Sequence, residues 1–223
     1  MKKYFLSNLI IAALIISAAF VSCNKDDDDG GNTATSITAK IDNASEFSDV
    51  KKVKIMAEYY ENNTWKEYAL AEADFKDGGF TINLPATVDA KYLEPYDEEE
   101  MPQEINVSNT NAKTLWIWSV KGFNSADEQI ARFWCGKEDS NSDTSMNWLY
   151  TDSDVNISGT NTSTEEEDDV VYEFTVIYSL VLKKGWNVVY DTYSQTKQGN
   201  KYIEKYEAKS SAVSGLKWIG EVW

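Results

Sequence analysis

The sequence contains no histidine. Histidine is the usual proton carrier in Ser-His-Asp and Cys-His catalysis, and it is the commonest side-chain ligand of metals in proteins. Its absence excludes those two catalytic arrangements and histidine-ligated haem, and it removes most kinds of zinc site. We therefore expect a protein that is not an enzyme, with no catalytic residues, no bound metal and no cofactor.

Positive charge is also scarce. The chain carries 21 lysines and arginines against 37 aspartates and glutamates, a formal net charge of −16, and Arg132 is its only arginine. Nucleic acids and anionic membrane surfaces are bound by clustered cations that displace counterions. The composition therefore predicts no nucleic-acid partner.

The longest apolar run lies near the N-terminus. Lys2 and Lys3 precede the run from Leu9 to Val21, which Ser17 alone interrupts. A membrane-spanning helix needs about 20 apolar residues, so this run is too short, whereas a charged start followed by a short apolar run is the layout of a signal peptide. We expect residues 1–22 to be a cleaved leader.

The end of this run, Phe20-Val21-Ser22-Cys23, resembles the lipobox of bacterial lipoproteins. The resemblance implies that Cys23 receives a diacylglycerol before cleavage in front of it, and two or three acyl chains hold a protein firmly on a bilayer. The membrane is then a partner through the lipid anchor. The alternative is an ordinary secretory signal cleaved near Ala18 or Ala19, which leaves Cys23 as a free thiol.

Cys23 and Cys135 are the only cysteines. If Cys23 carries lipid, Cys135 has no disulfide partner. Cys135 directly follows Phe133 and Trp134, and a thiol among aromatic side chains is more often a small buried hydrophobe than a nucleophile. We expect Cys135 to be buried and unreactive.

An acidic run follows the lipobox at once, comprising Asp26, Asp27, Asp28 and Asp29. It resembles the export signal of Bacteroidota surface lipoproteins, and the resemblance implies a lipid-anchored protein of the outer membrane that faces the cell exterior. A second interpretation, compatible with the first, is that the four carboxylates keep a flexible tether over residues 23–35 solvated and extended by mutual repulsion.

Beyond residue 35 the chain lacks any long amphipathic helical pattern, and short alternating runs take its place. Val53, Ile55 and Ala57 alternate with more polar residues, which is the period of a half-buried strand. Hydrophobic residues make up 42% and aromatic residues 13% of the chain, enough for a buried core. About ten short strands predict an all-β fold, either an antiparallel β-sandwich or a lipocalin-like barrel, with a meander-rich C-terminal half.

Glycine-containing turns place several of these strands. Asp77-Gly78-Gly79 predicts a hairpin within residues 68–84. Residues 172–182 alternate most regularly and predict a central strand, preceded by a polar loop that ends at residues 165–169. Gln198-Gly199-Asn200 predicts the turn into the next strand.

A second turn is predicted over residues 124–127, between strands at 114–123 and 129–135. Ser125 and Glu128 also fit the capping box of a short helix, which is the alternative for this segment.

An acidic stretch bracketed by Pro95 and Pro102 divides the chain. Proline restricts the backbone and like charges repel, so regular structure is not expected there. We expect residues 93–111 to be a loop between an N-terminal β region, 36–92, and a C-terminal β region, 112–223.

The segment Asp152-Ser153-Asp154-Val155-Asn156 opens like an EF-hand calcium loop. The pattern then fails, because Ile157 stands where glycine is required and Ser163 where the bidentate glutamate is required. A turn stabilised by Asx hydrogen bonds is expected instead, and a weaker calcium site built from loop carboxylates stays open.

The eight tryptophans include the candidate ligand-binding residues. The apolar face of a sugar packs on an aromatic ring while polar groups bind its hydroxyls. Trp116 and Trp118 share a face if their segment is a strand, and Trp186 directly follows a turn, so these three are the candidates. Trp218 and Trp223 should lie on opposite faces of the last strand. Most aromatic side chains in an all-β protein are nonetheless core residues or cross-strand pairs.

The body of the chain resembles the small β-rich lipoproteins of Bacteroidota through Asp77-Gly78-Gly79-Phe80, Lys184-Gly185-Trp186-Asn187 and Ser214-Gly215-Leu216-Lys217-Trp218. The resemblance implies a non-catalytic binding or accessory protein for the uptake of a glycan or similar nutrient. The alternative is a structural or protein-interaction module that contacts outer-membrane transporter components. A hydrolase that uses paired carboxylates is the third hypothesis.

Overall fold

The computed structural model describes residues 35–61, 63–95 and 102–223. In this part of the chain the fold is all-β, as predicted, but with more strands than the ten expected. The two helices are short 3-10 turns, η1 (Ala44–Phe47) and η2 (Ala90–Tyr92), and neither is long enough to cross a membrane. The strands are β1 (Ser36–Lys40), β2 (Lys52–Glu61), β3 (Thr64–Asp74), β4 (Gly79–Asn83), β5 (Glu94–Pro95), β6 (Asn106–Val107), β7 (Lys113–Ile117), β8 (Val120–Phe123), β9 (Gln129–Asp139), β10 (Ser142–Thr151), β11 (Val155–Glu167), β12 (Val170–Leu182), β13 (Gly185–Gln198), β14 (Lys201–Lys209) and β15 (Lys217–Val222).

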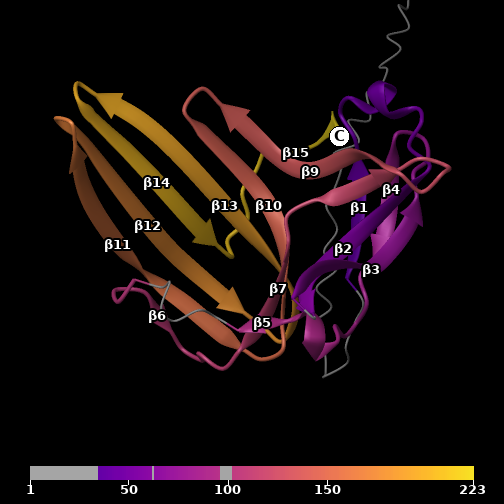
Figure 1. The fold of residues 1–223 in the computed structure, drawn as a ribbon, viewed down its shortest axis with the longest axis horizontal. Helices are drawn as coiled ribbons and strands as arrows, with labels where there is room; N and C mark the ends of the chain where they lie inside the picture. The colour runs from indigo at the N-terminus through magenta and orange to yellow at the C-terminus, as the bar shows by residue number, and fades with distance from the viewer. Residues whose placement is uncertain (1–34, 62, 96–101) are drawn as a thin grey trace, which may run out of the picture.

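The N-terminal strands form a β-sandwich, drawn in indigo and magenta in Figure 1. The two-stranded sheet β1-β4 packs against a sheet that contains β2, β3, β8 and part of β9. The predicted alternation in β2 is confirmed, because Val53, Ile55 and Ala57 are fully buried. Phe133 of β9 lies at the centre of this first core, edge-on to Phe47 and stacked on Phe75.

The hairpin predicted around Gly78 is only half right. The turn exists, with Asp77 and Gly78 at positive φ and a bridge between Lys76 and Gly79. The strand after it does not pair with the strand before it, because β4 pairs with β1 over its whole length. The turn therefore carries the chain across the sandwich from one sheet to the other, and this places Ile82 in the core.

The C-terminal strands form a large curved sheet in the order β10-β13-β14-β12-β11-β6, of which β11 to β14 are drawn in orange to yellow in Figure 1. The sheet does not close, so the lipocalin-like alternative does not apply and the sandwich-like one does. The expected meander holds within the hairpins β11-β12 and β13-β14. It does not hold between them, because β14 lies parallel to β12. The predicted strand at residues 172–182 is interior, as expected.

The polar loop predicted to end at residues 165–169 is wrong. Strand β11 continues to Glu167, and its glutamates pair with β12. Only Asp168 and Asp169, with φ of 50° and 63°, form the turn. Acidic side chains can occupy this stretch because it is a solvent-exposed edge of the sheet, where charge opposes unwanted strand pairing.

Strand β9 joins the two halves. Its first residues pair with β8, its last residues pair with β10, and β15 lies along its other edge. The other edge of β10 pairs throughout with β13. Strands from the expected N-terminal region, 36–92, and C-terminal region, 112–223, therefore share one thirteen-stranded sheet.

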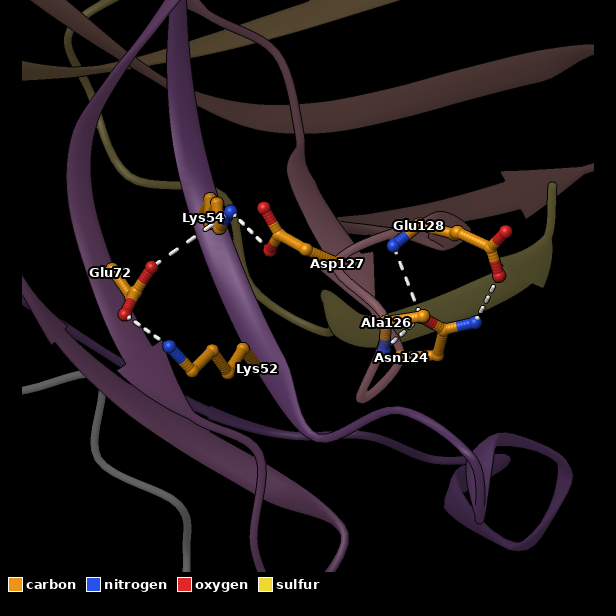
Figure 2. A network of polar contacts seen from close by, with 7 residues as sticks. All are labelled: Lys52, Lys54, Glu72, Asn124, Ala126, Asp127 and Glu128. Atoms are coloured by element: carbon orange, nitrogen blue, oxygen red, sulfur yellow. Dashed lines mark hydrogen bonds and ion pairs between the residues drawn. The ribbon is translucent and has the colours of Figure 1, made fainter.

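The turn predicted at residues 124–127 is confirmed, and the helix alternative is not observed. The Asn124 carboxamide oxygen accepts from the backbone N–H groups of Ala126 at 2.9 Å and Glu128 at 3.0 Å. Asp127 sits at φ 62° and its carboxylate pairs with Lys54 at 2.5 Å. Figure 2 shows how this turn is tied to β2, where Lys54 also faces Glu72 of β3.

Replacing Asn124 with alanine should lower the free energy of unfolding by about 1 to 2 kcal/mol, because two backbone donors in the turn lose their acceptor. Urea unfolding followed by tryptophan fluorescence measures the change. The matched control is Ser125→Ala, an exposed position in the same turn, which should unfold as the wild type does. Equal loss in both variants would contradict this role for Asn124.

Candidate ligand-binding cleft

Two of the three candidate tryptophans meet where β7 gives way to β8. Trp116 lies on β7 and Trp118 directly follows this strand. Their rings stack with centroids 4.8 Å apart and planes at 6°. Trp116 is half-buried, whereas 49% of Trp118 is exposed. The pair therefore presents one anchored and one open aromatic surface.

The sheet topology explains why this position is exposed. Strand β10 pairs with β9 up to Met146 and with β7 from Trp148 onward, so its edge partner changes between these residues. After Ile117 the chain leaves β10, and from Val120 it pairs with β9 and β2. Trp118 lies at the corner where these pairings diverge.

A cavity of about 640 Å³ opens beside the tryptophan pair, and we call it the tryptophan cleft. Two further indoles line it, Trp65 of β3 and Trp223, which are 64% and 69% exposed. Its charged and amide side chains are Glu58, Glu94, Lys121, Gln129 and Arg132.

Three charged residues of the cleft, Glu58, Lys121 and Arg132, form ion pairs along its wall. The Lys121 ammonium lies 2.5 Å from a Glu67 oxygen and 3.8 Å from a Glu58 oxygen. The Arg132 guanidinium lies 3.8 Å from Glu221. The Lys121–Glu67 pair is close, whereas the two 3.8 Å pairs are loose and their carboxylates face solvent, so Glu58 and Arg132 keep hydrogen-bonding capacity for a ligand.

Gln129 supplies a further free donor. Its amide nitrogen is buried and has no hydrogen-bond partner among the described residues. Most buried polar groups in proteins are paired, and an unpaired one costs free energy. Since Gln129 lines the cleft, a ligand acceptor placed there would satisfy it.

The third candidate, Trp186, lies elsewhere. Its indole N–H donates to the Pro85 carbonyl oxygen at 2.8 Å, and its ring meets Tyr150 edge-on at 5.3 Å. It packs against the first core and does not line the tryptophan cleft. The structure thus brings Trp116 and Trp118 together and separates Trp186 from them. Cys23 and the run Asp26–Asp29 lie outside the described residues.

Trp65, Trp223, Gln129 and Arg132 were missed by sequence reasoning. For Trp223 a partial signal exists: Trp218 is buried in the core and Trp223 is exposed, although Trp223 follows the last strand, β15, and is not part of it. The other three come from strands whose neighbours along the cleft are remote in sequence. Their convergence depends on the order of strands in the sheet, which no local pattern reveals.

No family model, curated protein or solved structure matches this chain. What the cleft can bind must therefore follow from its own residues. Flat indole faces, together with carboxylate, guanidinium and amide groups at their edges, are suited to a ligand that has an apolar face and a rim of hydroxyls.

The EF-hand-like segment bends at Asp152 and Ser153 and then enters β11, and its carboxylates bond to remote residues and not to the segment's own backbone as an Asx turn would. Asp152 accepts from the backbone N–H of Lys113 at 2.9 Å. Asp154 accepts from the Lys184 backbone N–H at 2.9 Å and pairs with the Lys183 ammonium at 2.8 Å. Across the described ranges no three acidic or cysteine side chains gather in a way that could hold a metal ion.

Cys135 is buried in the first core, and burial raises the pKa of its thiol to about 11. The thiolate, not the thiol, is the nucleophile that attacks an alkylating reagent. In a Cys23→Ser protein, where Cys135 is the one thiol, alkylation at pH 8 should be at least about a hundredfold slower in the native state than in guanidinium. Mass spectrometry of quenched samples measures the rates. Similar rates in both states would contradict the burial of Cys135.

Proposed function

We propose that this protein is a non-catalytic glycan-binding protein, anchored through Cys23 and displayed on the outer face of an outer membrane. The tryptophan cleft is the observation that carries the proposal. It offers the stacked pair Trp116 and Trp118, two more exposed indoles, and polar groups of both charge signs.

The size and openness of the cleft favour a sugar over a small apolar ligand. Sites for small molecules commonly enclose about 300 to 1,000 Å³, so the volume is sufficient. Trp65, Trp118 and Trp223 are exposed by roughly half or more, which suits stacking against one face of a chain that keeps its other face in water. Leaving such large apolar rings in solvent is otherwise a cost that function must explain.

The polar rim supports the same ligand class. Sugar hydroxyls both donate and accept hydrogen bonds, and the rim contains acceptors in Glu58 and Glu94 and donors in Gln129 and Arg132. Binding of this kind requires no chemical step. The accessory role follows from the anchor, because a glycan held at the cell surface is available to an uptake system there.

Replacing Trp118 with alanine should weaken glycan binding about tenfold or more, since a stacking ring contributes about 1 kcal/mol beyond its buried area. A glycan array identifies the ligand, and titration calorimetry with wild type, Trp118→Ala and Tyr172→Ala measures the effect. Tyr172 is a matched control, an exposed ring on β12 that lines no part of the cleft.

The protein-interaction alternative predicts a different result. Tyr172 and Phe174 are exposed on the outer half of the curved sheet, where they could contact a transporter component. Two results together would refute the glycan proposal and support this one. The glycan array would show no signal, and the wild type, but not Tyr172→Ala, would capture a stoichiometric partner from solubilised outer membranes.

Replacing Asp26, Asp27, Asp28 and Asp29 together with alanine should leave the protein lipidated at Cys23 but protected from protease added to intact cells. The expectation follows from assigning surface export to this acidic run. Immunoblots of protease-treated cells, with lysed cells as the control, measure protection. Continued digestion on intact cells would show that the run is only a tether.

A further inference from the structure

A second, smaller cavity of about 270 Å³ is also lined by Trp118. Its floor is formed by β10, β13 and β14, which present Ser145, Asp191 and Tyr206. Strand β9 forms a wall with Trp134. We call this space the Asp191 cavity. Trp118 lines it and also lines the tryptophan cleft.

Asp191 is an unusual group for such a floor. Its side chain is 6% exposed. One carboxylate oxygen, Oδ2, accepts from the Asn147 amide at 2.7 Å. The other, Oδ1, has no hydrogen-bond partner among the described residues. A buried carboxylate that is only half paired is costly, and it therefore calls for an explanation outside folding.

The electrostatic surroundings indicate the same cost. Burial raises the pKa of the Asp191 carboxyl, and the Tyr206 hydroxyl and the Asn147 amide only partly oppose that rise. Burial and the nearby Asp191 charge raise the pKa of Tyr206 in turn. The neighbouring Tyr178 is affected in the same way. Within the described residues, no lysine or arginine forms an ion pair with Asp191 that would offset its charge.

The rest of the cavity combines aromatic rings with further negative charge. Its aromatic side chains are Trp118, Trp134, Tyr193 and Tyr206. Its rim carries two acidic residues, Glu138 and Asp143, against one basic residue, Lys137. Aromatic faces attract cations, and they do so more strongly where water is excluded. Rings, excess negative charge and an unpaired buried acceptor together fit a positively charged donor.

We propose that the Asp191 cavity binds a primary ammonium group of a small organic ligand, which donates a hydrogen bond to Asp191 Oδ1 while the rings of Trp134 and Tyr193 contact its apolar part. A quaternary ammonium has no N–H and would leave Oδ1 unpaired. A neutral hydroxyl compound would not balance the negative charge. This site goes beyond the glycan proposal and does not depend on it.

The test uses the full-length protein in detergent and three probes of similar size: D-glucosamine, D-glucose and N-acetyl-D-glucosamine. They differ at one substituent, and only glucosamine carries a primary ammonium. Titration calorimetry to tens of millimolar should show glucosamine binding at least about tenfold tighter than either neutral probe. Equal binding of all three, or no binding of glucosamine, overturns the proposal.

The key variant is Asp191→Asn, which keeps the shape and the acceptor for Asn147 but removes the charge. It should weaken glucosamine binding at least about tenfold. The control is Asp49→Asn, the same change at an exposed position outside the cavity, which should bind as the wild type does. Unchanged binding by Asp191→Asn overturns the proposal.

Two measurements keep the test decisive. A raised carboxyl pKa means that the native state loses stability as the pH rises above the ordinary value of 3.8, so Asp191→Asn should melt no lower than wild type at pH 7.

Asp143→Asn, at the exposed rim, cannot disturb the floor and should weaken glucosamine binding a few-fold, less so at high salt. If Asp191→Asn melts at a lower temperature than wild type, the Asp143→Asn variant decides the test. Unchanged affinity of Asp143→Asn for glucosamine then overturns the proposal. A chain that binds glucosamine but no glycan refutes only the function proposed for the tryptophan cleft.

Discussion

The burial of strand β10 on both faces is the constraint on which the rest of the structure depends. Met146, Trp148 and Tyr150 point into the first core, while Leu149 points into the second. The second core otherwise comes from the curved sheet and the segment before β7, with Ile157, Leu180 and Leu182 among its fully buried members. A strand that two cores share cannot slip by one residue without exchanging its faces. It therefore fixes the two halves relative to each other.

This constraint also creates the two cavities. One edge of β10 is fully paired with β13, so the strands that serve the N-terminal sandwich must share the other edge. Along β10 from Ser142 to Thr151, the first residues pair with β9 and the last residues pair with β7. Between Met146 and Trp148 this edge of β10 changes its partner from β9 to β7. Trp118 follows β7 at this point, and it lines both the tryptophan cleft and the Asp191 cavity.

Features that depend on neighbours in sequence could be predicted, and those that depend on strand order could not. The alternation of Val53, Ile55 and Ala57 and the turn at residues 198–200 follow from local physics, and both are observed. The pairing of β4 with β1 depends on a remote strand. Strand β11 lacks apolar alternation toward its end because its edge position tolerates Ser, Thr and Glu. Trp116 and Trp118 could be paired from their spacing, whereas bringing Trp65 and Arg132 beside them required the topology.

The distribution of the tryptophans separates packing from function. Trp148 and Trp218 stack on each other in the first core, and burial of their large apolar rings is reason enough for their presence. Trp118 is half exposed, so its stacking on Trp116 stabilises the fold far less than full burial would. The same contrast holds for carboxylates, since Asp154 is paired at the surface while Asp191 is buried with one oxygen unpaired. Both exceptions border the corner beside β10. Trp118 and Asp191 therefore lie where the sheet leaves space for a ligand.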